Sequence, residues 1–424
     1  MQVFASIFIE GKIVKYLFVL VVFAASLAEA SPQAPPYDLP PDADVGQIHA
    51  AVAPETFALS ENELAIKVGL RNHAWLDLIN RVRPEGQKLS FTSKETAVGY
   101  PIDHPMEYSP SLIDMRLASA EKALPPEMKS ILFDGAELTE ALPVEQDVFL
   151  TNGRAIDRVY QSALRWQMMQ PYLSYLEDRR ARDVRGYYNF GKMAEAERRS
   201  KLASPSSWSS EENAVLADWL TQMCMNAGKS SQDCQQNVST EIAAGHDMNA
   251  LYDSTLSSAK AVWNSFFAID SAYARTDIKY GGEDVFNTFF QMPESDAAKS
   301  FLQDNIEDEW RWGGWHLKLN FTPNAETHVV FVAGATPHVD RLGGSEITMN
   351  ADQPLTEYDA QWVIRHEFGH TLGFPDCYLE FYDGDRQVMV SYQLDTTDLM
   401  CSRKGHLLER EVSELKRAYG HARK

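Results

Sequence analysis

Apolar residues recur every three or four positions along much of the amino-terminal part of the chain, and this spacing predicts helices. The first is expected near Ser60, because Ser60 and Glu63 together fit a capping box. Its apolar positions at helical spacing are Leu64, Val68, Leu76 and Ile79. Four further helical patterns, bounded by Pro, Gly or Ser clusters, cover residues 110–124, 154–202, 209–227 and 239–268. This region is therefore predicted to be mainly α-helical.

The pattern changes near Asp270, after which helices and β-rich runs alternate. Residues 294–312 predict an amphipathic helix whose apolar side holds Ala297, Phe301, Ile306 and Trp310. Three strands are expected at residues 316–322, 328–334 and 345–350. A helix starting near Thr356 follows, and a last helix covers residues 407–420. This order predicts an α+β fold with a mixed sheet, preceded by the helical region.

The composition is that of a folded protein that does not bind nucleic acid. Of the 424 residues, 44% are hydrophobic and 11% aromatic, which is enough for cores in more than one domain. Acidic residues outnumber basic ones by 60 to 39, and the formal charge of -21 repels phosphate backbones. Nucleic acid is therefore not an expected partner. The chain divides into residues 1–30, 31–55, 56–269 and 270–424.

The first of these segments, residues 1–30, has the features of a secretory signal peptide. Lys12 and Lys15 precede an apolar run that ends in small residues at Ala28 and Ala30, so cleavage is expected after Ala30. An uncleaved membrane anchor is the alternative, and no other stretch could cross a bilayer. The mature protein is thus expected to be secreted, extracellular or periplasmic, and free of the membrane. Residues 31–55 are expected to be a Pro-rich linker.

Export to an oxidising compartment favours disulfides among the four cysteines. Cys224 and Cys234 flank a short polar loop and form a natural local pair, which leaves Cys377 and Cys401 for a second bond. Separate buried thiols are one alternative. Another is that the Cys224 thiolate binds a metal and keeps the protein latent before activation.

The stretch HEFGHTLGFPD, residues 366–376, has the spacing of a catalytic metal site. In a helix, His366 and His370 present their imidazoles to the same point, and Glu367 lies beside it. Gly373 stands where the helix must end, and the chain can then turn back to offer Asp376. Two imidazoles and one carboxylate leave one position of the zinc open. This arrangement is typical of a hydrolytic zinc site rather than a structural one.

These residues resemble the long zinc motif of the metzincin metalloproteases, H-E-x-x-H-x-x-G-x-x-H, with the aspartate of the snapalysin type in the last place. That family has a methionine-containing turn under the zinc, and TTDLMCS, residues 396–402, is similar to it with Met400 as the methionine. The resemblance covers about residues 290–424 and implies a metzincin-like domain with a helix and mixed strands before the motif. It also implies an antiparallel edge strand, at residues 343–350, that pairs with the substrate.

Two departures from the family pattern leave alternatives open. Aspartate is shorter than histidine, so other groups remain candidates for the third ligand: Cys377, Glu380, Asp383 and His406. In some members of the family, a tyrosine two residues after the methionine stabilises the transition state. This chain has Ser402 at that position. The candidate substitutes are Tyr378, Tyr382 and Tyr392.

The sequence therefore predicts a secreted zinc-dependent endopeptidase that holds one catalytic Zn²⁺ and acts on a protein or peptide substrate. Glu367 is the expected general base, which takes a proton as zinc-activated water attacks the peptide carbonyl. The helical region is expected to be a propeptide or an accessory domain. The alternatives are an inert binding or adhesion protein with a structural zinc, and a zinc hydrolase that cleaves a non-peptide amide. No feature of the sequence specifies an oligomeric state.

Overall fold

The computed structural model describes residues 8–9, 12–13, 62–91, 99–280 and 284–420. By its contacts the chain forms two compact units, Met1–Gln33 and Ala34–Lys424. In the first unit, strands β1 (Phe8–Ile9) and β2 (Lys12–Ile13) pair antiparallel. The rest of the predicted signal peptide, its cleavage site and the Pro-rich linker lie outside the described residues. No helix in the described part is long and apolar enough to span a membrane.

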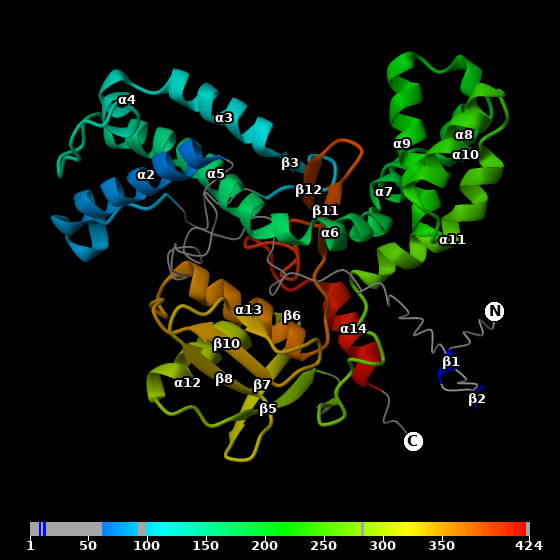
Figure 1. Cartoon of the computed structure of the whole chain (residues 1–424). Coiled ribbons are helices and arrows are strands. Elements are labelled where there is room, and N and C mark those ends of the chain that lie inside the picture. The colour runs from blue at the N-terminus through cyan, green and yellow to red at the C-terminus, as the bar shows by residue number, and fades with distance from the viewer. Residues whose placement is uncertain (1–7, 10–11, 14–61, 92–98, 281–283, 421–424) are drawn as a thin grey trace. The chain divides into compact units, whose positions relative to one another are not determined.

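In the second unit, the first group of helices packs around one apolar core (Figure 1). The helices are α2 (Glu63–Arg81), α3 (Pro110–Ala123), α4 (Pro126–Leu132) and α5 (Gln146–Met169), with a 3-10 turn over Glu85–Gln87. The predicted capping box is wrong, because Asn62 is the N-cap of α2 and Glu63 is its first residue rather than its third. Leu64 is 53% exposed, and Ala65 faces the core instead.

The second group of helices packs around a core that includes Phe190 and Leu220. The helices are α7 (Arg185–Lys192), α8 (Glu195–Leu202), α9 (Ser210–Asn226), α10 (Ser231–Ala243) and α11 (Asn249–Ser265). The helix before them, α6 (Leu173–Arg179), packs through Leu176 into the core of the first group. The pattern predicted over 154–202 is thus several helices, because 3-10 turns interrupt it at Gln170–Tyr172 and Arg180–Arg182. A third such turn, Pro205–Ser207, precedes α9, which begins with a capping box of Ser209 and Glu212.

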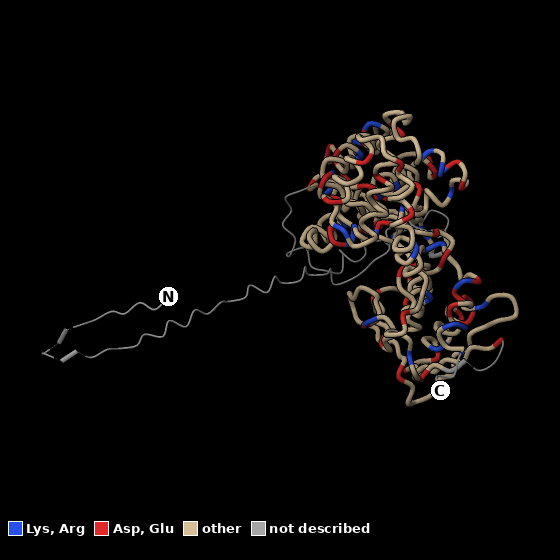
Figure 2. The backbone as a smooth tube through the Cα atoms, turned by 90° about the vertical axis from the view of Figure 1, so that its right-hand side faces the viewer, with Lys and Arg blue, Asp and Glu red and all other residues tan. Residues whose placement is uncertain are grey.

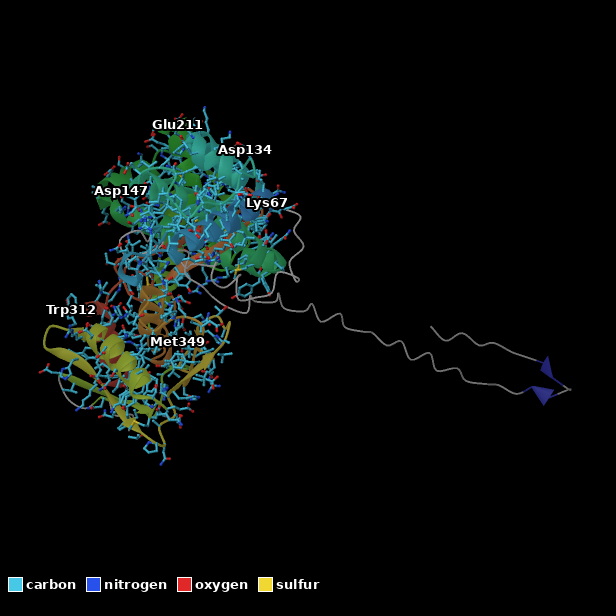
Figure 3. The ribbon with its side chains drawn as sticks, turned by 90° about the vertical axis from the view of Figure 1, so that its left-hand side faces the viewer. Lys67, Asp134, Asp147, Glu211, Trp312 and Met349 are labelled. Carbon is cyan, nitrogen blue, oxygen red and sulfur yellow. A yellow bond between two sulfur atoms is a disulfide. The ribbon has the colours of Figure 1, made fainter. Side chains whose placement is uncertain are left out.

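The carboxy-terminal part contains two small mixed sheets as well as helices. The prediction of an α+β fold is therefore confirmed at the level of the fold class. One sheet has the order β4 (Lys279–Tyr280), β5 (Val285–Gln291), β7 (Trp315–Thr322), β6 (Arg311–Trp312). The other has the order β8 (His328–Val332), β10 (Glu346–Asn350), β9 (His338–Val339). The pairs β5–β7 and β8–β10 are parallel, and β9 runs antiparallel to β10. Met349 of β10 is buried (Figure 3).

One prediction about this part is wrong, and another is confirmed only in part. The predicted edge strand over 343–350 is β10, which lies between β8 and β9, so the antiparallel edge strand is the shorter β9. The predicted helix over 294–312 is confirmed in part: α12 (Asp296–Leu302) continues through one π-helical turn (Gln303–Glu307) to residue 309, and Phe301, Ile306 and Trp310 are buried as predicted. Ala298 is buried in place of Ala297, and Trp312 belongs to β6, where it is 44% exposed (Figure 3).

Two helices complete the carboxy-terminal part, α13 (Tyr358–Thr371) and α14 (Glu409–Tyr419). Between them, β11 (Tyr378–Asp383) and β12 (Val388–Gln393) form a hairpin. This hairpin pairs with β3 (Met106–Tyr108), which comes from the helical region (Figure 1). Residue 270 therefore marks a change from helices to strands within one compact unit. Acidic and basic residues are interspersed along that unit (Figure 2).

Candidate metal centre

Helix α13 and the turn after it bring the predicted ligands together. His366 and His370 are four residues apart on α13, and both are buried. Their Nε2 atoms lie 3.1 Å apart. The Oδ1 atom of Asp376 is 3.1 Å from Nε2 of His366 and 3.3 Å from Nε2 of His370. These three atoms form a nearly equilateral triangle.

The size of this triangle matches a zinc site. Zinc binds imidazole nitrogen and carboxylate oxygen at about 2.0–2.1 Å, so two corners of its tetrahedron are about 3.3–3.4 Å apart. The separations of 3.1, 3.1 and 3.3 Å are close to that value. His366, His370 and Asp376 can therefore hold a metal ion and leave the fourth corner of its tetrahedron open.

Backbone carbonyl groups fix the orientation of both rings. Nδ1 of His366 donates a hydrogen bond to the Leu399 carbonyl at 3.0 Å, and Nδ1 of His370 donates one to the Phe374 carbonyl at 2.8 Å. In a neutral ring with its proton on Nδ1, the Nε2 atom carries a lone pair. Two such lone pairs and a carboxylate oxygen would then face one another, an arrangement that can hold a metal ion between them.

The electrostatics of the triangle also favour positive charge. Burial lowers the pKa of His370, but the negative charge of Asp376 and its hydrogen bond raise it more, to about 10. Burial raises the pKa of Asp376, and the two histidines lower it more, so that it stays below its usual range. A proton therefore binds strongly in the place that a metal ion would take.

Gly373 makes the turn that returns the chain to the histidines. Its φ is 88°, a left-handed value that glycine adopts without strain. Its N–H donates to the His370 carbonyl at 2.9 Å, and the N–H of Phe374 donates to the Gly369 carbonyl at 3.1 Å. These two bonds form a Schellman motif, which ends α13 and directs the chain back toward the ligands.

Met400 lies directly beneath α13 at Gly369. A side chain at Gly369 would overlap the Met400 sulfur, so only glycine allows this approach. The residue before Met400, Leu399, supplies the carbonyl that orients His366. On another side, the Trp362 ring stacks on His366 with their centroids 4.9 Å apart. Sequence reasoning missed Gly369 and Trp362, although Gly369 stands inside the motif itself.

The alternative third ligands all have other partners. Cys377 is bonded to Cys401. Glu380 is paired with Arg165, Asp383 with Arg180, and His406 with Glu309. Both predicted disulfides are present, so the alternative of separate thiols is wrong. Cys224 is bonded to Cys234, so the alternative that its thiolate binds the metal is also wrong.

The three candidate tyrosines all have neighbours outside the triangle. The hydroxyl of Tyr392 donates to Asp183 at 2.9 Å. The Tyr382 ring packs against Trp166 of α5. Tyr378 is buried in β11, opposite Gln393 of β12. These contacts do not favour any of the three as a transition-state group, and the choice among them stays open.

Glu367 is the one acidic group of the motif that is not used to build the site. It is 9% exposed, and no described residue forms a hydrogen bond or an ion pair with its carboxylate. Its negative charge contributes to the raised pKa of His370, so it lies near the triangle. This carboxylate is free to exchange protons with a molecule bound there.

No family model, curated protein or solved structure matches this chain. The function must therefore be argued from the site itself.

Proposed function

We propose that this protein is a secreted zinc-dependent endopeptidase of the metzincin type. The observation that carries the proposal is the triangle of His366, His370 and Asp376, with the carboxylate of Glu367 near it and bonded to none of the described residues. A structural zinc is normally enclosed by four protein ligands, whereas three ligands and a nearby base are typical of hydrolytic sites.

Bound zinc would supply a Lewis acid that polarises a peptide carbonyl and lowers the pKa of water. The remaining chemistry is done by the chain itself. Glu367 takes the proton of the attacking water and passes it to the leaving amine. His366 and His370 keep fixed orientations because their Nδ1 protons are bound to carbonyls. Asp376 contributes negative charge, which makes the water a weaker acid and the role of Glu367 more important.

Strand β9 offers a place for a peptide substrate. It is the antiparallel edge of its sheet, and its pairing with β10 leaves its other side without a strand in the described structure. The turn between β9 and β10 contacts the metal-binding helix, since the Gly343 N–H donates to the His370 carbonyl at 2.8 Å. An extended peptide that pairs with β9 would therefore lie near the site. The two disulfides are consistent with secretion or a periplasmic location.

The test is hydrolysis by the purified protein of casein and of a mixed peptide library, with and without a chelator. We expect cleavage of internal peptide bonds that the chelator abolishes and added zinc restores. Zinc binding without turnover would instead support an inert binding protein. Turnover confined to a cell-wall or metabolite amide would support a hydrolase of non-peptide bonds.

A further inference from the structure

The hairpin of β11 and β12 connects the two parts of the candidate metal centre. Asp376 lies just before β11, and the turn that contains Met400 follows β12. At the base of the hairpin, the Cys377 N–H donates to the Met400 carbonyl at 3.1 Å and the Leu394 N–H to the Cys377 carbonyl at 3.0 Å. The Cys377–Cys401 disulfide joins the same two segments. The position of the hairpin therefore fixes both the third ligand and the floor of the site.

A buried carboxylate in this hairpin depends on the helical region for its partners. Glu380 of β11 is 1% exposed. Arg165 of α5 donates to it twice, from Nε to Oε1 at 2.6 Å and from Nη2 to Oε2 at 2.8 Å. The hydroxyl of Tyr108 in β3 donates to Oε1 as well, and among these donors only Ser391 belongs to the hairpin. A buried carboxylate without such donors is strongly destabilising, so β11 keeps its place only while Arg165 and Tyr108 are present.

The helical region also contacts the other strand of the hairpin. β3 pairs antiparallel with β12, with Tyr108 opposite Met389. The Tyr392 hydroxyl of β12 donates to Asp183 at 2.9 Å and accepts a hydrogen bond from the Val184 N–H at 3.1 Å. The hairpin is thus bound on several sides by residues that precede the sheets in the chain.

We propose that residues 106–192 are a permanent part of the metal centre and that Arg165 is a positioning residue for Asp376. The proposal rests on the metal site put forward above. It implies that these residues stay with the mature protein and are not discarded as a propeptide. Their loss would leave Glu380 without its main donors and remove β3 from the sheet of the hairpin.

The first test is the mass of the metal-loaded protein purified from the medium of cells that secrete it. We expect the zinc-containing species to include residues 106–192, either in one chain or held together after a nick. A zinc-loaded, folded species that lacks this segment would overturn the proposal.

The second test compares zinc affinity, measured by competition with a chelator, in two matched variants. Arg165→Lys keeps the charge but loses the paired hydrogen bonds to Glu380, so the zinc dissociation constant should rise about tenfold. The absorption bands of bound Co²⁺ should also change, because Asp376 shifts relative to the ion. The control is Arg199→Lys, which alters an exposed ion pair with Asp253 in the second group of helices. This variant should not change the zinc affinity.

If Arg165→Lys does not fold, Tyr108→Phe is measured in its place, because it removes one hydrogen bond to Glu380 and leaves both charges. Weaker zinc binding by either variant supports the proposal. A variant with wild-type zinc affinity and an unchanged Co²⁺ spectrum would overturn the positioning role of Arg165 but leave the proposed function intact. A wild-type protein that binds no zinc overturns the proposed function and, with it, this inference.

Discussion

Two carboxylates four positions apart, the buried Glu380 and the half-buried Asp376, have opposite surroundings. Glu380 receives hydrogen bonds from Arg165, Tyr108 and Ser391, so the protein itself satisfies it. Asp376 faces the Nε2 atoms of two imidazole rings. Both rings donate their Nδ1 protons to backbone carbonyl groups. One cluster is satisfied within the protein, and the other could hold a metal ion. The difference supports a structural role for the first and the proposed binding role for the second.

The two clusters also differ in origin. Every ligand of the candidate metal site comes from an eleven-residue stretch, 366–376. The cluster around Glu380 joins residues more than two hundred positions apart, since Arg165 and Glu380 are separated by 215. In our proposal the local cluster carries the chemistry, and the long-range cluster positions its third ligand.

The largest effect is expected at Glu367, which has no structural role in either cluster. Glu367→Gln keeps the size of the side chain but removes the base, so kcat should fall by about 10²- to 10⁴-fold. Zinc content, measured by elemental analysis, should stay at the wild-type value. The exposed control Glu211→Gln should leave kcat unchanged (Figure 3). Substantial turnover by Glu367→Gln would contradict the assigned role.

The next largest effect is expected from Arg165→Met. It leaves Glu380 buried and unpaired, and the free energy of unfolding should fall by about 3–5 kcal/mol in a denaturant titration. The double variant Arg165→Met/Glu380→Met removes both charges and should recover most of that loss. Equal stability of the single variant and the wild type would show that this cluster is not structural.

A smaller effect is expected at Gly369. An alanine there would overlap Met400, and overpacking of this kind costs about 1–3 kcal/mol in stability. The control is Gly191→Ala, where the added methyl group meets no atom within 4 Å. Because this position is helical, the free energy of unfolding should rise by about 0.5–1 kcal/mol. Thermal unfolding of both variants is the measurement. An unchanged melting temperature for Gly369→Ala would mean that Met400 does not support the metal-binding helix.

The last prediction concerns the pH dependence of stability at Glu411 of α14 and, per pH unit, is the smallest change. Burial raises its pKa and the charge of Asp398 raises it further, to about 8, although Arg410 lowers it. Since the ordinary value is 4.5, the folded protein binds this proton more tightly than the unfolded chain does. Its contribution to stability is complete below pH 4.5 and is lost as the pH rises to about 8, by at most about 1.4 kcal/mol per pH unit.

The measurement is the unfolding free energy of the wild type and Glu411→Gln between pH 5 and about pH 8. Glutamine does not titrate, so the wild type should lose stability relative to the variant as the pH rises. Parallel curves for the two proteins would show that Glu411 does not titrate in this range.

Features set by local spacing could be predicted from the sequence. The helix over 110–124 and the strands β7 and β10 follow from periodicity, and the triangle of ligands follows from a four-residue step and a glycine turn. The pairing of β3 with β12 and of Arg165 with Glu380 could not be predicted, because contacts between distant segments leave no periodic signal. The edge position of β9 was missed because a strand of two residues has no recognisable pattern.

The most direct test of the central claim is the metal content of protein purified without added metal or chelator. We predict one zinc ion per chain, removed by a strong chelator and absent from His366→Ala and His370→Ala variants that still fold. Stoichiometric zinc that persists in both folded variants, or a hydrolytically active wild type with no bound divalent metal, would contradict the account.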